Sequence, residues 1–229
     1  MVAHIEQPSA EVTWREAGAG RIPVSTRFDD PYYSLENGLE ETRHVFLAGN
    51  DLPGRFRDGF HIAELGFGTG LNLFAAALAW READQAGQLH FTSFEAFPVS
   101  HAVAAAAWAA FPEIAEVAAE LAPLWQGESV LELPWLRAEI ILGDARQTLP
   151  RWAGEADAWF LDGFSPTRNP ELWEPALLAA VGARTKAGGT CATYSAAGDV
   201  RRALAAAGFE VSRVPGYGRK RHMTRARRP

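Results

Sequence analysis

The sequence predicts an α/β fold with a mostly parallel β-sheet covered by helices on both faces. Short apolar runs alternate along the chain with longer helical segments, and parallel strands need such crossover helices. Several of the apolar runs end in loops that contain glycine or an acidic residue, as buried parallel strands do. The 229 residues, 48% of them hydrophobic, suffice for one core without disulfides or metal sites.

The N-terminal part of the chain differs in composition from the rest. Glycine, proline, asparagine and aspartate punctuate the first 55 residues, and they interrupt regular structure. We therefore expect residues 1–55 to form an irregular extension packed on a main domain of residues 56–229. Within the extension, residues 38–47 are predicted to form a short helix, because its acidic first turn suits the helix dipole.

Seven strands are predicted in the main domain. Each is a short run of apolar or β-branched residues that stops at a turn signal. The clearest run ends in Trp159, Phe160 and Leu161, since consecutive apolar side chains indicate a strand buried on both faces. In chain order, the predicted strands are residues 60–65, 90–94, 139–142, 156–161, 190–194, 209–214 and 222–225.

Helices are predicted between most of these strands. Gly87 follows the first helix, Pro112 halts the second, and Lys186 with the Gly188-Gly189 pair closes the fourth. The predicted helices are residues 71–82, 100–110, 114–125, 171–185 and 198–207.

The last two predicted strands follow one another with only a short connection. This spacing indicates an antiparallel hairpin at one edge of the sheet. Such an ending is unlike a dinucleotide-binding Rossmann domain. It is typical of the Rossmann-like, doubly wound, seven-stranded sheet of a class I methyltransferase that uses S-adenosyl-L-methionine.

The net charge of −6 is unevenly distributed along the chain. Seven basic and no acidic residues lie between residue 211 and the C-terminus, so the preceding residues carry −13. A basic segment on an acidic protein indicates an anionic partner that meets one face. The same charge pattern fits a solvated tail that keeps the protein in solution, and the sequence leaves both readings open.

Cysteine and histidine usage excludes several classes of protein. The single cysteine cannot form an internal disulfide or a paired zinc site, and the six histidines show no metal spacing, so we expect no metal and a cytoplasmic location. The N-terminus does not resemble a signal peptide, and no apolar stretch approaches the ~20 residues of a membrane helix. The oligomeric state is left open, and a monomer is compatible with the sequence.

A glycine-rich loop connects the first predicted strand of the main domain to its helix. Its G-x-G-x-G spacing differs from the G-x-G-x-x-G of NAD-binding proteins. Glycines let a ligand lie against the backbone, and an acid two residues earlier suits a cationic amino acid group such as that of S-adenosyl-L-methionine. A purely structural turn is the alternative. The cofactor-binding residues predicted here are Glu64, Gly66, Phe67, Gly68, Thr69, Gly70 and Asn72.

Two further acidic residues follow the next strands. Glu95 closes the second strand, where a carboxylate can accept both ribose hydroxyls of a nucleoside. Asp144 follows the third strand and is placed to accept from an adenine amino group. Helix capping or a turn is the alternative role for each. Because the carboxyl ends of parallel strands form the ligand crevice, we expect both residues at the cofactor.

The fourth strand ends in Asp162, followed by Gly-Phe-Ser-Pro. A carboxylate here can orient an amine nucleophile through its N–H groups and accept the released proton, so Asp162 is the predicted catalytic residue. Phe164 and Pro166 are predicted to form an apolar wall for a planar base. The family resemblance described below implies that Ser165, between them, also adjoins the acceptor. Helix capping is the alternative role for Asp162.

At these residues the chain resembles a known family. The segments ELGFGTGLN, SFEAFP, DAWFLDGFSPTRNPELW, GGTCATYSAAGDVRRALAAAGFEV and GYGRKRHM, with DDPYYSLENGLEETRHVFLAGNDLPGRF near the N-terminus, closely resemble the MnmC/MnmD family of tRNA methyltransferases. The resemblance covers residues 12–223. FLDGFSP with its downstream NP and W, and GYGRKR, are too specific for a generic methyltransferase.

The resemblance implies a reaction and a substrate. The family methylates the primary amine of 5-aminomethyl(-2-thio)uridine at the tRNA wobble position, giving the 5-methylaminomethyl product. It implies that Asn37, Gly38 and Glu41 approach the cofactor. A wobble base is already unpaired, and the basic segment, including Arg219, Lys220 and Arg221, can meet the phosphates that flank it.

The resemblance also sets an expectation about the flavin-dependent half that many family members carry. The chain ends at Pro229 and has no second glycine-rich nucleotide loop, so we expect no FAD and a stand-alone methyltransferase or a fragment of a fusion. The alternative function is methylation of a small-molecule amine or hydroxyl, since a fold does not fix its substrate.

Overall fold

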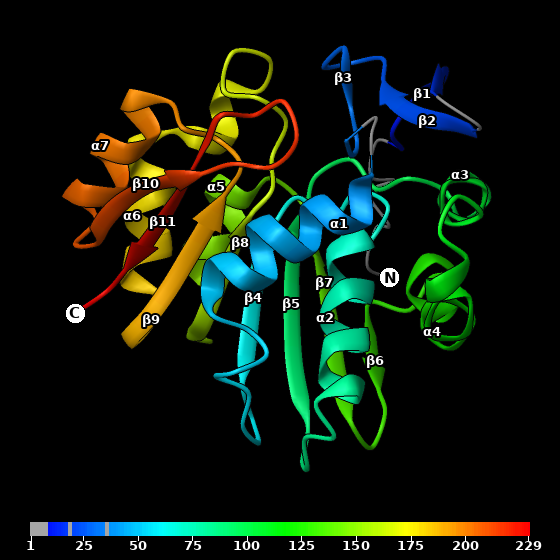
Figure 1. Ribbon diagram of the computed structural model, residues 1–229, viewed down its shortest axis with the longest axis horizontal. Coiled ribbons are helices and arrows are strands. Elements are labelled where there is room, and N and C mark those ends of the chain that lie inside the picture. Colours follow the sequence, from blue (N-terminus) through cyan, green and yellow to red (C-terminus); the bar gives the residue numbers. More distant parts are fainter. Residues whose placement is uncertain (1–8, 18–19, 35–36) are drawn as a thin grey trace, which may run out of the picture.

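The computed structural model describes residues 9–17, 20–34 and 37–229, and its centre is an eight-stranded sheet (Figure 1). The strands are β4 (His61–Leu65), β5 (Leu89–Glu95), β6 (Val130–Glu132), β7 (Leu136–Leu142), β8 (Ala156–Leu161), β9 (Thr185–Thr193), β10 (Glu210–Pro215) and β11 (His222–Arg227). Their spatial order is β10-β11-β9-β8-β4-β5-β7-β6. The five inner strands β4, β5, β7, β8 and β9 run parallel, so the predicted fold class is confirmed.

The two edges of the sheet are antiparallel. β11 pairs antiparallel with both β9 and β10, which confirms the predicted hairpin at one edge. At the other edge, the three-residue β6 pairs antiparallel with β7. The predicted count of seven strands is therefore wrong by one, because β6 is too short to show an apolar period in the sequence.

β9 begins earlier than predicted. Lys186, Gly188 and Gly189 were expected to end a helix, but they lie within β9. The pairing of β8 with β9 shifts register between Ala156 and Ala158, and this irregularity accommodates Gly188 at a φ of +72°. The glycine pair marks a bulge in a strand and not a helix terminus.

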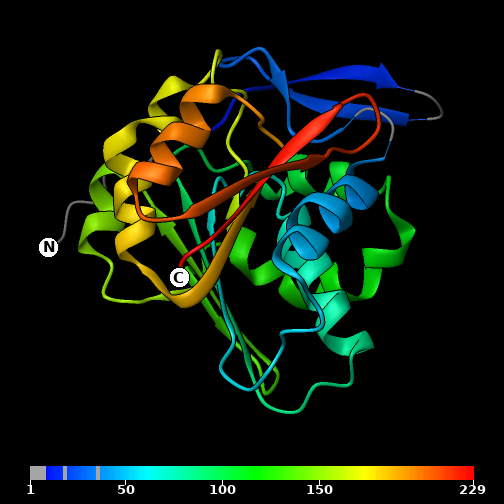
Figure 2. The ribbon, with the colours of Figure 1, turned by 60° about the vertical axis from the view of Figure 1, so that its left-hand side comes forward.

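Helices cover both faces of the sheet, as Figure 2 shows from the side. The helices are α1 (Gly38–Thr42), which continues as a π-helical turn (Arg43–Leu47), α2 (Leu71–Glu82), α3 (His101–Trp108), α4 (Ala115–Leu121), α5 (Ala145–Thr148), α6 (Pro175–Ala183) and α7 (Gly198–Ala206). The predicted helix 114–125 is shorter because 3-10 turns flank α4. The predicted helix 171–185 starts late, because a separate 3-10 turn precedes Pro175 at the start of α6.

The core consists of two layers, one on each side of the sheet. Phe160 packs with α1, α2 and α4, whereas its neighbours Trp159 and Leu161 pack with α5, α6 and α7. Alternate side chains of one buried strand therefore enter opposite layers. Leu39 and Phe46, from the predicted N-terminal extension, are buried in the first layer. No helix among the described residues has both the length and the apolar composition needed to cross a bilayer.

The N-terminal residues are more regular than expected. A three-stranded antiparallel sheet is formed by β1 (Val12–Ala17), β2 (Gly20–Ser25) and β3 (Asp30–Pro31). It lies beyond the carboxyl ends of the parallel strands (Figure 1). The expectation of an irregular extension is therefore wrong for this part, since its prolines and glycines lie within or next to short strands.

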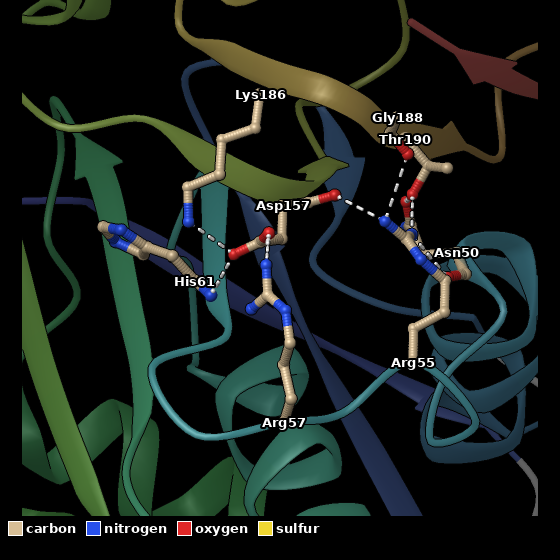
Figure 3. Close-up of polar contacts among 8 residues, drawn as sticks. All are labelled: Asn50, Arg55, Arg57, His61, Asp157, Lys186, Gly188 and Thr190. Atoms are coloured by element: carbon tan, nitrogen blue, oxygen red, sulfur yellow. Dashed lines mark hydrogen bonds and ion pairs between the residues drawn. The ribbon is translucent and has the colours of Figure 1, made fainter. Parts of the chain in front are cut away.

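A buried carboxylate connects the amino ends of three parallel strands, at the end of these strands that faces away from the small N-terminal sheet (Figure 3). Asp157 accepts hydrogen bonds from the backbone of His61 at 2.9 Å, from Lys186 at 2.7 Å and from Arg57 at 2.6 Å. Burial opposes ionisation of Asp157, but these donors outweigh it and lower its pKa. Beside it, Arg55 donates to Thr190 and to the carbonyl of Asp157. The cluster fixes β4, β8 and β9 relative to one another.

We expect Asp157→Asn to destabilise the fold by about 2–4 kcal/mol, because it leaves the Lys186 charge without its buried partner. Urea unfolding followed by circular dichroism measures the change. Asp199→Asn is the matched control, since its ion pair with Arg202 is exposed and should contribute less than about 1 kcal/mol. Equal losses in the two variants would contradict the anchoring role of Asp157.

His61 should make stability fall in mild acid. Burial, followed by the nearby His90 and Lys186, lowers its pKa from 6.5 to about 4. The folded state therefore binds fewer protons than the unfolded chain, and stability present above pH 6.5 is lost as the pH falls to about 4. His61→Gln should reduce the slope of stability against pH in this window by up to about 1.4 kcal/mol per pH unit. A slope in His61→Gln equal to that of the wild type would contradict this role of the buried imidazole.

Candidate active site

A cavity of about 1010 Å³ lies at the carboxyl ends of β4, β5 and β8, beneath the small N-terminal sheet. Ligand sites typically measure about 300–1,000 Å³, so this cavity can hold a nucleoside cofactor and part of a second substrate. Most predicted site residues line it. These are Gly38, Glu41, Gly66, Phe67, Gly68, Thr69, Asn72, Glu95, Asp144, Asp162, Phe164, Ser165, Arg219 and Lys220.

Five predicted site residues lie outside the lining of this cavity. Asn37 caps α1, where its side chain accepts from the backbone of Glu40. The others are Glu64, Gly70, Pro166 and Arg221. Their parts in binding stay predictions, and Glu64 is the most informative because it lies directly behind the cavity wall.

The glycine loop passes directly against the end of β8. Gly66 has a φ of +92°, and a Cβ placed on it would lie 2.6 Å from the backbone oxygen of Asp162. Only glycine fits both this conformation and this approach. The close contact fixes the position of Asp162 relative to the loop.

Glu95 reaches across to the glycine loop. Its Oε2 accepts from the backbone N–H of Gly68 at 3.0 Å, and its Oε1 accepts from that of Phe97 at 2.7 Å. Each carboxylate oxygen keeps a further lone pair. Glu95 is therefore held rigidly at the cavity wall and can still accept hydroxyl groups.

Asp144 caps the short helix α5. Its Oδ1 accepts from the backbone of Arg146 at 2.9 Å, and the guanidinium of Arg146 binds the same carboxylate. These hydrogen bonds lower its pKa. The capping role considered in the sequence is thus present, and Asp144 also lines the cavity.

Two carboxylates from adjacent strands share one amide. Nδ2 of Asn72 donates to Oε1 of Glu64 at 2.8 Å and to Oδ2 of Asp162 at 2.7 Å. The amide oxygen of Asn72 accepts from the hydroxyl of Thr42 at 3.0 Å. Ser93 donates to the other oxygen of Glu64 at 2.6 Å. All donors and acceptors of the Asn72 amide group are therefore engaged.

The protonation of these carboxylates departs from that of exposed ones. Burial raises the pKa of Glu64 well above its ordinary value. Burial and the charge of Glu41 raise the pKa of Asp162 to about 7, against the opposing effects of the Asn72 hydrogen bond and Lys220. Asp162 thus exchanges its proton near neutral pH, as a general base should.

An aromatic wall adjoins Asp162. The ring of Phe164 lies 4.9 Å from Phe28 and 5.2 Å from Tyr32, measured between centroids. The backbone N–H of Ser165 donates to Asp30 at 2.9 Å, which links this loop to the N-terminal sheet. The wall is therefore built by residues more than a hundred positions apart.

Lys220 closes the cavity from the connection between β10 and β11. Its ammonium contacts Oε1 of Glu41 at 2.7 Å and lies 3.9 Å from the centre of the Tyr194 ring. The hydroxyl of Tyr194 donates to the backbone oxygen of Gly163 at 2.7 Å. The ammonium group of Lys220 thus faces Glu41 and lies near Asp162.

Sequence reasoning missed several residues that shape the cavity. Phe28, Asp30, Thr42 and Tyr194 all line it. No local pattern marks them, since each acts through a partner distant in the sequence. Tyr194 is the one of these four that the predicted strands could have indicated, because it lies at the carboxyl end of a predicted parallel strand, as Asp162 does.

Comparison with known proteins identifies the family. A family model described as "S-adenosyl-L-methionine-dependent methyltransferase" matches residues 111–229. The chain belongs to this methyltransferase family. Its cofactor is S-adenosyl-L-methionine, as the glycine loop predicted. The remaining lone pairs of Glu95 at the cavity wall suit the hydroxyl groups of a nucleoside.

Relatives of the methyltransferase confirm the resemblance to the MnmC/MnmD family. The "tRNA 5-methylaminomethyl-2-thiouridine biosynthesis bifunctional protein MnmC" of Caulobacter vibrioides (strain ATCC 19089 / CIP 103742 / CB 15) is 47% identical over 227 residues, 95% of this chain and 38% of the relative. The protein of the same name from Aromatoleum aromaticum is 49% identical over 214 residues, 90% of this chain and 34% of the relative. The chain spans just over a third of the length of these relatives.

Solved structures agree with the family. The crystal structure of MNMC2 from Aquifex aeolicus matches with a TM-score of 0.76 and 28% identity, over 97% of this chain and 71% of that chain. A spermidine synthase in complex with a transition state analogue matches with a TM-score of 0.53 at 12% identity, over 95% of this chain and 74% of that chain, and supports the fold alone.

Gly66→Ala should impair the methyltransferase far more than its effect on folding explains. The new methyl group must displace the backbone of Asp162, and a misplacement of about 1 Å can cost on the order of 100-fold in kcat/KM. Gly208→Ala is the matched control, because Gly208 has nearly the same φ, +93°, with open space around it. Both variants are compared by thermal melting and by methyl-transfer rate. Similar rates in the two would contradict the importance of the contact.

Proposed function

We propose that this chain methylates the primary amine of 5-aminomethyl(-2-thio)uridine at the wobble position of tRNA, giving 5-methylaminomethyl(-2-thio)uridine. The observation that carries the proposal is Asp162, a base with a pKa near neutrality, set between the glycine loop and an aromatic wall. The names of the relatives specify this modified nucleoside and support the choice of substrate.

The cofactor would be held by residues of three strand ends. The loop from Gly66 to Thr69 would lie along it, Glu95 would accept its ribose hydroxyls and Asp144 would accept from its adenine amino group. Glu64 would act from behind the wall through Asn72. When bound, S-adenosyl-L-methionine supplies a methyl group on a positively charged sulfur.

Asp162 would prepare the nucleophile. Its carboxylate accepts an N–H of the substrate amine and so directs the nitrogen lone pair along the line of attack. With the amine held by Asp162, methyl transfer would make a C–N bond in place of the methyl–sulfur bond, and the bonding electrons would stay with the sulfur. The product ammonium then loses a proton to Asp162, which returns it to solvent. Glu41 and Lys220 set the charge around this exchange.

The uridine itself would lie beside Phe164 at the aromatic wall. A wobble base is unpaired in the anticodon loop, so the enzyme avoids most of the few kcal/mol that extrusion from a duplex costs. Ser165 and Pro166 would border the base. We place the reaction in the cytoplasm, where a free buried thiol such as that of Cys191 stays reduced.

The pH dependence of methyl transfer tests the role of Asp162. Because the ionised carboxylate is the active form, kcat/KM should rise with pH with a midpoint near 7. Asp162→Asn should lower kcat by about 10²–10⁴-fold, abolish this limb, and leave S-adenosyl-L-methionine affinity nearly unchanged by calorimetry. Asp199→Asn is the control. An unchanged pH profile in Asp162→Asn would contradict the assignment.

The substrate is tested with labelled S-adenosyl-L-methionine and tRNA from cells that accumulate 5-aminomethyluridine. We expect the label in 5-methylaminomethyluridine after nucleoside digestion. Equal rates on the free nucleoside or on a small amine would instead favour a metabolite methyltransferase. Absence of S-adenosyl-L-methionine binding would refute both.

A further inference from the structure

The basic C-terminal segment divides into two groups along the β10–β11 hairpin. Thr224 of β11 lies opposite Thr193, near the carboxyl end of β9, whereas Arg227 lies opposite Thr190, further from that end. Since β9 runs parallel to β8, its carboxyl end is the end at the cavity. The basic residues before Thr224 are therefore near the cavity, and those after it lead away.

Two of the three arginines in the group that leads away make contacts within the fold. Arg225 contacts Asp51 at 2.5 Å. Arg228 donates to the backbone oxygens of Gly182 and Thr185. Arg225 and Arg228 therefore have structural partners, and residues 225–228 are a poor candidate for a binding surface.

The group near the cavity has a different environment. Pro215 of β10 pairs with His222 and Arg213 pairs with Thr224, so Arg213 and Arg221 lie close to His222. Desolvation, followed by the charges of Arg213, Arg221 and Arg201 of α7, lowers the pKa of His222. Among the residues that the structure describes, no carboxylate pairs with any of these three arginines, and Nε of Arg201 is buried without a hydrogen-bond partner. We call Arg201, Arg213, Arg221 and His222 the hairpin cluster.

The hairpin cluster adjoins the opening of the cavity. Tyr217, Arg219 and Lys220 line the cavity, and Arg221 and His222 follow them directly in the chain. Figure 2 shows the connection between β10 and β11 reaching toward the N-terminal sheet that covers the cavity. A base inside the cavity would therefore leave its sugar-phosphate backbone close to the cluster.

Physical chemistry favours an anion at this cluster. Like charges gathered without acids repel one another, and this repulsion is relieved when an anion binds. A guanidinium group can bind two phosphate oxygens at once, and an arginine without a carboxylate partner is free to do so. Single-stranded RNA presents phosphates at regular intervals beside an accessible base.

We propose that the hairpin cluster is the phosphate-binding surface for the RNA strand that flanks the methylated base, and that the terminal arginines 225, 227 and 228 are not part of it. This inference rests on the proposed function, because it assigns the surface that delivers the tRNA to the cavity.

Two double variants with the same loss of charge test the surface. R213Q/R221Q removes two arginines of the hairpin cluster, and R225Q/R227Q removes two from the far part of the same hairpin. tRNA binding is measured by fluorescence anisotropy at several salt concentrations. R213Q/R221Q should weaken binding by about 10- to 100-fold at 0.1 M salt and lower the slope of log K against log salt by about 1.4–1.8. R225Q/R227Q should match the wild type.

The controls separate folding, function and surface. Both double variants should remain folded by circular dichroism and bind S-adenosyl-L-methionine like the wild type. R213K/R221K should restore the slope because it restores the charge. If the wild type methylates tRNA but R213Q/R221Q and R225Q/R227Q have equal slopes, the phosphate-binding role of the hairpin cluster is wrong and the proposed function stands. A wild type that binds S-adenosyl-L-methionine but methylates no tRNA overturns the proposed function.

Discussion

The site depends on one amide that holds two carboxylates at neighbouring strand ends. Glu64 is the penultimate residue of β4 and Asp162 follows β8, and both accept from the same nitrogen of Asn72. Two buried anions this close would repel strongly without a shared donor or proton. The amide nitrogen supplies the donor, and the raised pKa values of both acids show that a proton can be retained as well. The proposed cofactor side and the proposed acceptor side of the cavity are thereby coupled through Asn72 of α2.

The N-terminal segment completes this arrangement. Thr42 fixes which end of the Asn72 amide faces the acids, since its hydroxyl donates to the amide oxygen. Glu41, one residue earlier, adds a negative charge near Asp162 and takes Lys220 as its counter-ion. A short helix outside the parallel sheet therefore orients the groups that the sheet brings together. This role requires a fixed helix, and the apolar side chains of residues 38–47 are accordingly buried in the core.

Much of this could be predicted from the sequence, because parallel strands place their carboxyl ends at one edge. Glu95, Asp144 and Asp162 each follow a recognisable apolar run, and all three line the cavity. Pairings over long distances could not be predicted, since nothing local to Thr42 or Asp30 indicates its partner. The net charge of residues 211–229 was also insufficient, because it does not show that Arg225 pairs with Asp51 whereas Arg213 has no carboxylate partner among the described residues.

The Glu41–Lys220 ion pair joins residues 179 positions apart, near the two ends of the chain. A flexible loop of this length costs more conformational entropy to close than a short one. The cavity is therefore completed only when nearly the entire polypeptide has collapsed. Ligand binding at this site therefore requires both ends of the chain to be in place at once, so it reports on the assembly of the whole chain and not of the central sheet alone.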